Sequence, residues 1–89
     1  MNKQRRRALG ALIPQLEMMC TLREEITDRL DTIMGEEQEA LDNLPESLQE
    51  SERGQQMQEY IDTMEEVLDA LQEIDVDDLI SSIEEIADS

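Results

Sequence analysis

Carboxylates are the side chains of this sequence whose number and spacing favour a chemical role. Residues 54–89 contain 12 Asp and Glu and no Lys or Arg. As a helix, this segment would carry a carboxylate about every 4.5 Å of its length, and two such helices side by side would carry one about every 2.3 Å. Duplex DNA carries a phosphate about every 1.7 Å, so the carboxylates could occupy a groove that binds DNA. The residues predicted to form this acidic face are Glu59, Asp62, Glu65, Glu66, Asp69, Glu73, Asp75, Asp77 and Asp78.

Three consecutive arginines near the start of the chain form a second candidate site. Arg5, Arg6 and Arg7 lie in residues 1–14, which contain no acid. Guanidinium groups bind phosphate in a bidentate manner, so these residues could hold a nucleotide and sequester it as a signal. They could equally contact the acidic region of a neighbouring subunit or form an unstructured basic tip.

Pairs of carboxylates also raise the possibility of a magnesium site. Glu36 and Glu39, followed by Glu59 and Asp62, have the spacing that all-α nucleotide pyrophosphatases of the MazG type use to hold Mg²⁺. A chain so rich in acids produces such a pattern by chance, and no Lys or Arg lies near the second pair to hold a triphosphate. We therefore expect no enzyme activity, no catalytic residue, no metal and no cofactor.

The overall composition excludes several other classes of site. The chain has 89 residues, with 24 Asp and Glu, 7 Lys and Arg and a formal net charge of −17. The absence of His excludes imidazole metal sites and His-based triads. A single cysteine, Cys20, allows no internal disulfide, and we expect it in the core. Because an acidic chain repels phosphate, we expect no direct binding of DNA.

The elements that must position these side chains are helices. In residues 15–42, apolar side chains recur every three or four residues, which predicts an amphipathic helix. The predicted stripe is Leu16, Met19, Leu22, Ile26, Leu30 and Ile33. Pro14 suits the first turn of this helix. Residues 1–13 are then a basic N-terminal arm or a separate short helix.

A turn is predicted at about residues 43–51. Asn43 before Leu44-Pro45 is a stop signal, because the residue before a proline disfavours the helical conformation. Ser47 and Glu50 have the spacing of a capping box. Ser51 is a second candidate to cap the next helix.

The next helix begins near Ser51 and has a heptad-like stripe from Met57 to Ile74. The stripe fails at Asp75, which indicates a kink or break at about 75–78. Asp75 or Asp77 would then cap a final helix over about 77–87, and this is a stronger interpretation of the acidic run than a calcium loop.

The predicted fold is therefore all-α, with two long amphipathic helices in an αα-hairpin and a short C-terminal helix. Residues 14–89 form a single domain in this prediction. A chain of this size buries a small core, so we expect a homodimer that forms a helical bundle. We find no signal peptide and no membrane-spanning segment and expect a cytoplasmic protein.

The run Glu36–Gly54, with the motif Ile61-Asp62-x-Met64-Glu65-Glu66 and the basic start Lys3–Arg7, resembles a group of small acidic helical proteins. These are encoded by bacteriophages and prophages of low-GC Gram-positive bacteria. The resemblance covers roughly residues 15–75, and the chain departs from the group at Pro14 and at 75–78. It implies a phage context in a bacterial host cell, but no settled activity and no catalytic residues.

The charge pattern and this resemblance together predict an inhibitor that binds protein. It would act on a host defence or DNA-processing complex, as an anti-CRISPR or anti-restriction protein does, by presenting the acidic face as a DNA mimic. Its partner would be a basic host or phage protein, such as a nucleic-acid-binding nuclease complex. The alternative is a structural or adaptor coiled coil whose acids serve solubility alone.

Overall fold

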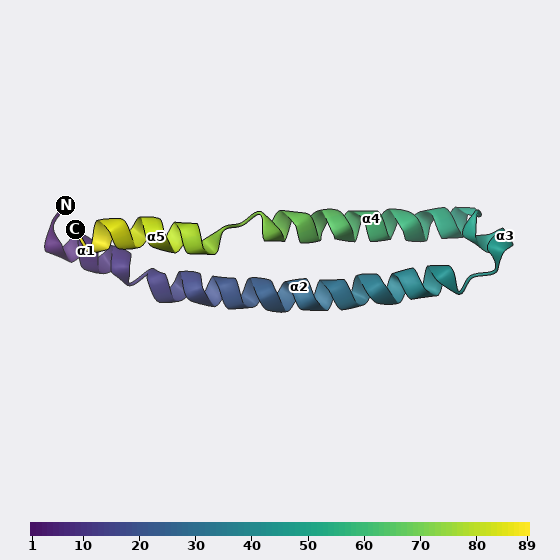
Figure 1. Ribbon diagram of the computed structural model, residues 1–89, viewed down its shortest axis with the longest axis horizontal. Helices are drawn as coiled ribbons and strands as arrows, with labels where there is room; N and C mark the ends of the chain where they lie inside the picture. Colours follow the sequence, from purple (N-terminus) through teal and green to yellow (C-terminus); the bar gives the residue numbers. More distant parts are fainter. The chain divides into compact units, whose positions relative to one another are not determined.

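The computed structural model describes all 89 residues, and it confirms the prediction of an all-α, hairpin-like fold. The helices are α1 (Lys3–Gly10), α2 (Ile13–Asp42), α3 (Glu46–Gln49), α4 (Glu52–Gln72) and α5 (Val76–Ala87) (Figure 1). The chain divides into two compact units. Unit 1 comprises Met1–Glu25 and Ile74–Ser89, and unit 2 comprises Ile26–Glu73. The predictions of one domain over 14–89 and of a homodimer stay predictions.

Unit 2 is a helical hairpin formed by the second half of α2, the short α3 and α4. α2 ends at Asp42, directly before the predicted stop signal. The predicted capping box at Ser47 is wrong, because α3 begins earlier, at Glu46, and Pro45 stands at its N-cap. The fixed φ of proline starts the turn there, and the Pro45 carbonyl accepts the Leu48 N–H at 2.8 Å. Ser51 stands at the N-cap of α4, but its hydroxyl donates to the Leu48 carbonyl.

One glycine allows the chain to close this turn. Gly54, in the first turn of α4, is buried against the backbone of α3. A Cβ at this position would lie 2.6 Å from the Gln49 carbonyl carbon and 2.7 Å from the Leu48 carbonyl oxygen. Carbon atoms pack at about 3.5–4.0 Å, so a larger residue would push α3 and α4 apart.

The core of unit 2 contains Leu41 from α2 and Ile61 and Leu68 from α4. Half-buried residues continue the inward stripe at steps of three and four, as expected for helices packed in a hairpin. On α2 they are Thr27, Leu30 and Met34, and on α4 they are Met57, Met64 and Leu71.

The predicted stripe of α2 is therefore only partly correct. Leu16 and Leu30 are half-buried as predicted, whereas Met19, Leu22, Ile26 and Ile33 are 40–53% exposed. The reason is that α2 has two adjacent apolar stripes, each with the spacing of a helix. The inward one passes through polar or weakly polar residues, among them Cys20 and Arg23, which hide it in the sequence.

Unit 1 combines α1, the first half of α2 and α5, with α1 packed against α5. α1 is the short helix that the prediction allowed within residues 1–13, and the Asn2 side chain caps it by accepting the Arg5 N–H at 2.8 Å. The predicted break before the last helix is confirmed, since α5 starts at Val76 and Asp75 caps it. Val76 is the most buried side chain, at 1% exposed.

Arg23 links two segments of unit 1 that are distant in the sequence. Its guanidinium donates to the Ile74 carbonyl just beyond the end of α4, and it lies 3.7 Å from the Cys20 sulfur. The cation thereby serves a carbonyl that has no partner within a helix, close to the helix end where the dipole favours positive charge. Cys20 is half-buried beside it.

Candidate acidic interface

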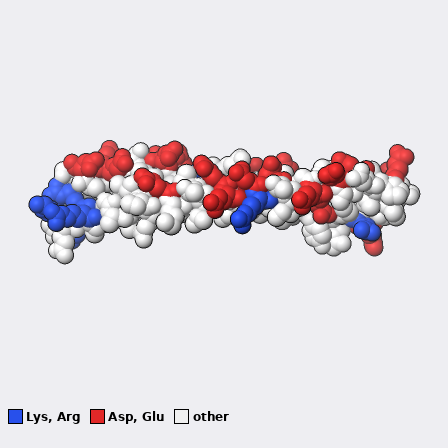
Figure 2. All heavy atoms as spheres, turned by 90° about the horizontal axis from the view of Figure 1, so that it is seen from below, with Lys and Arg blue, Asp and Glu red and all other residues white.

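The acidic residues of α4 occupy one side of that helix. Counted at about 100° per residue, six of the predicted site residues lie within an arc of about 120°, and all six are exposed. They are Glu59, Asp62, Glu65, Glu66, Asp69 and Glu73. Along the axis they follow one another about every 4 Å, close to the spacing of about 3.4 Å along one strand of DNA. Figure 2 views the molecule from the side of α2 and shows that acidic side chains also gather along one border of that face.

The other three predicted residues belong to unit 1 and have a structural role. Asp75 accepts the backbone N–H of Asp78 at 3.0 Å and so caps α5. Asp77 and Asp78 lie in the first turn of α5, where negative charge interacts favourably with the helix dipole. All three are exposed. That they form one continuous surface with the α4 carboxylates stays a prediction.

The three arginines of α1 do not converge on one point. Arg6 is half-buried and donates to the backbone carbonyl of Ser89. Arg6 and Arg7 line an open depression of about 500 Å³ together with Lys3 and Asp88. Arg5 lines a different depression with Met1, Ala8, Leu9 and Leu12. That Arg5, Arg6 and Arg7 bind a phosphate together stays a prediction.

The two carboxylate pairs are not gathered into a metal site either. Glu36 and Glu39 lie on α2, and Glu59 and Asp62 lie on α4. The structure contains no group of three or more Asp, Glu, Cys or His side chains that could hold a metal ion. Nor does any helix contain a stretch that is both long and apolar enough to cross a membrane.

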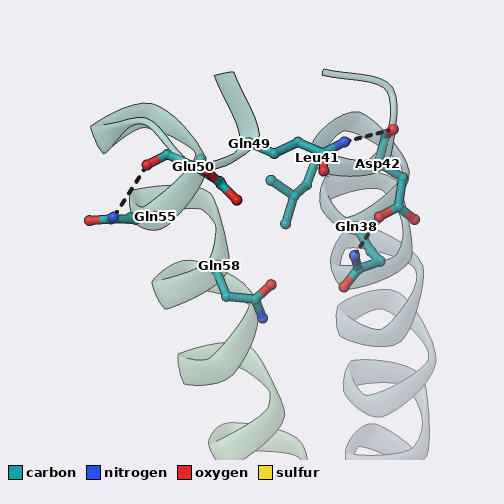
Figure 3. Close-up of a pocket in the computed structure, with 8 residues that line it drawn as sticks. Gln38, Leu41, Asp42, Gln49, Glu50, Gln55 and Gln58 are labelled. Atoms are coloured by element: carbon teal, nitrogen blue, oxygen red, sulfur yellow. Dashed lines mark hydrogen bonds between the residues drawn. The ribbon is translucent and has the colours of Figure 1, made fainter. Parts of the chain in front are cut away.

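A pocket of about 740 Å³ lies at the turn of unit 2, and the sequence did not indicate it. Its lining comprises Gln38, Leu41, Asp42, Gln49, Glu50, Gly54, Gln55 and Gln58 (Figure 3). The glutamine amides bond locally, as Gln38 does to the Asp42 carboxylate at 3.0 Å and Gln49 to the Asp42 carbonyl at 3.3 Å. The lining contains two carboxylates, Asp42 and Glu50, and no Lys or Arg.

A second surface that the sequence did not predict is exposed and almost free of acid. On α2 and α4, apolar residues each directly precede a residue of the inward stripe, so they lie about 100° around the helix from the core. We call these residues and the exposed positions between them the apolar side. Within unit 2 it comprises Ile26, Arg29, Ile33, Glu36 and Ala40 on α2, and Arg53, Gln56, Tyr60, Thr63, Val67 and Ala70 on α4. Glu36 is its one carboxylate. The signal in the sequence is the recurrence of Met19, Ile26 and Ile33 every seventh residue.

No protein-family model, no curated protein and no solved structure matches this chain.

Proposed function

We propose that this chain is a phage-encoded inhibitor that binds a basic protein of a host defence or DNA-processing complex, of the anti-CRISPR or anti-restriction type. The acidic side of α4 occupies the groove in which that protein binds nucleic acid. The inhibitor performs no catalysis and acts in the cytoplasm of the bacterial host.

The observation that carries this proposal is the confinement of the acids to one side of α4. If the acids served solubility alone, they could be spread over all exposed positions of the helix. Instead, Gln56, Thr63 and Ala70 are exposed but uncharged. The six carboxylates on the opposite side follow one another at nearly the axial spacing of phosphates along a DNA strand. A protein that binds DNA through its backbone would therefore meet a similar charge pattern.

Complementary charge also gives the proposal a kinetic signature. A strongly acidic surface accelerates encounter with a basic groove, and added salt screens this attraction. We expect the association rate to fall as salt rises, while the dissociation rate changes less.

The experiment compares two variants that neutralise the same number of carboxylates. Glu59→Gln, Glu66→Gln and Glu73→Gln together remove charge from the acidic side of α4, and Glu17→Gln, Glu24→Gln and Asp31→Asn remove it from α2. Each tagged protein captures partners from a host lysate. The retained protein is then tested for binding of a labelled duplex and for loss of that duplex when the chain is added.

We expect the α4 variant to lose capture and displacement, and the α2 variant to retain both. If the retained proteins bind no nucleic acid, or if the α4 variant captures them as well as the unaltered chain, the inhibitor proposal is wrong. The alternative of an adaptor coiled coil would then stand, and the exposed apolar side is the observation that favours it.

A further inference from the structure

We propose that a second copy of this chain covers the apolar side, so that two hairpins pack face to face with their acidic sides outward. This inference concerns a different surface from the acidic interface, and it does not depend on the inhibitor proposal.

The first step is that the apolar residues of α2 and α4 lie on the same side of unit 2. Ile26 and Ile33 each precede an inward residue by one position, and Tyr60 and Val67 do the same. α2 and α4 run in opposite directions in the hairpin (Figure 1). Two antiparallel helices are related by a rotation about an axis perpendicular to the plane of the pair. This rotation preserves the one-residue offset from the inward stripe. It also leaves a stripe that lies above the plane of the pair above that plane, so that the exposed apolar stripes of α2 and α4 form one surface.

The second step is that this surface is apolar and unpartnered. Ile33 and Tyr60 are each 53% exposed, and Val67 is 45% exposed. Beside Ile33, an open depression of about 360 Å³ is lined by Asp28, Arg29 and Thr32 as well. Clustered apolar side chains of this kind mark interaction surfaces. Scattered exposed residues would carry no such meaning, but here they recur every seventh residue on both helices.

The third step is the area that such a surface can bury. Within unit 2, α2 contributes residues 26–42 and α4 contributes Glu52–Gln72, and strips about 10 Å wide along these helices have a combined area of about 570 Å². A stable protein–protein interface buries about 800 Å² on each partner. The apolar side, with about 570 Å² on each partner, is therefore large enough for a small dimer interface at the low end of the sizes observed for specific interfaces, whereas a single partner helix would cover only part of it.

The fourth step is charge, which identifies a second copy as the occupant. Two chains of net charge −17 repel one another unless their acids face away from the interface. The apolar side contains only one of the acids of α2 and α4, Glu36. On α2 this side has two charges, Arg29 and Glu36. A two-fold axis that crosses α2 near Ile33 places Arg29 of each copy opposite Glu36 of the other. Such a self-complementary patch is what an isologous dimer requires.

The experiment measures the mass of the full chain in solution by light scattering over a wide range of concentrations. We expect twice the chain mass of 10.3 kDa. Ile33→Glu places a charge in the apolar side, and Thr32→Glu places the same charge one residue away, on the acidic side. Ile33→Glu should weaken dimerisation on the order of a hundredfold and keep its helical circular dichroism, and Thr32→Glu should stay dimeric.

The pair of opposite charges gives a second test that leaves the apolar residues in place. Arg29→Glu alone and Glu36→Arg alone should each weaken the dimer, and the double exchange should restore it. This test decides the matter if Ile33→Glu unfolds. A chain that is monomeric at all concentrations, an Ile33→Glu protein that dimerises as well as Thr32→Glu, or a double exchange that restores nothing would each overturn the proposal. A monomer would leave the apolar side to a different protein.

Discussion

Gly54 and Gly35 provide a matched pair for testing how the turn of unit 2 is closed. Both lie in helices, and Ala is the better helix former by about 0.8–1.0 kcal/mol. By propensity alone, Gly54→Ala and Gly35→Ala would therefore raise stability by similar amounts. The surroundings of the two residues differ, however. A Cβ at Gly35 would meet no atom within 4 Å, whereas a Cβ at Gly54 would meet the backbone of Leu48 and Gln49.

The magnitude at Gly54 follows from these contacts. The new Cβ would lie about 1 Å inside the ordinary contact distance of two backbone atoms. Relief requires a shift of α3, because backbone cannot move aside as a flexible side chain does. The Leu48 carbonyl also accepts the Ser51 N–H at 3.2 Å, so the shift disturbs the turn. Overpacking of this kind costs about 1–3 kcal/mol, and after the gain of about 0.8–1.0 kcal/mol in helix propensity the net loss of stability is up to about 2 kcal/mol.

The assay is thermal unfolding followed by circular dichroism, at one protein concentration because association shifts the midpoint. For a domain of this size, 1 kcal/mol corresponds to about 4–8 °C in Tm. We expect Gly35→Ala to raise Tm by about 4–8 °C, whereas Gly54→Ala should not raise Tm and should lower it by up to about 8–16 °C. Gly10→Ala, whose Cβ would lie 3.9 Å from the Ala87 Cβ, is the control for ordinary contact. If Gly54→Ala raised Tm as Gly35→Ala does, the close approach of α3 to Gly54 would be wrong.

Two further substitutions test the helix cap and the core. Asp75→Ala removes the acceptor for the Asp78 N–H and should lower the free energy of unfolding by about 1 kcal/mol, measured by urea unfolding; an equal loss in Asp77→Ala would show that the cap is not the cause. Leu68→Ala removes a core side chain that is 8% exposed and should cost about 2–5 kcal/mol, whereas exposed Glu66→Ala should stay within about 0.5 kcal/mol. Similar losses in these two variants would contradict the core described for α4.

The helix ends could be predicted because their causes are local. The stop at Asp42 follows from Asn43 and Pro45 in the next three residues, and the cap at Asp75 follows from one side chain and one N–H three residues later. The capping box at Ser47 failed because two local signals overlapped, and the fixed φ of Pro45 started α3 earlier. Nearby residues were thus sufficient to predict where the helices end, but they did not show which of two overlapping start signals, Pro45 or Ser47, would determine the start of α3.

Contacts between helices could not be predicted in the same way. The sequence predicts only that Gly54 lies in a helix. The packing of α3 against Gly54 explains why no larger residue fits there. The inward stripe of α2 includes Cys20, Arg23 and Thr27, and a search for apolar spacing passes over them. Arg23 is inward because it serves the Ile74 carbonyl, which comes from a segment far away in the sequence.

The relation between the apolar side and the acidic side gives the charge of this chain a physical meaning. On α5 of unit 1, Leu79 and Ile86 also precede inward residues by one position, so the same offset recurs in three helices. Chance placement of surplus apolar residues would put some of them on the side that the acids occupy. The consistent offset instead separates one side whose exposure to water is unfavourable from another side whose charges are stable only in water. In the proposed dimer, burial of the first against a second copy would leave the α4 carboxylates of both copies exposed on opposite faces. Each face would then offer a basic partner the acidic side of one copy, so that the dimer would carry two separate acidic surfaces.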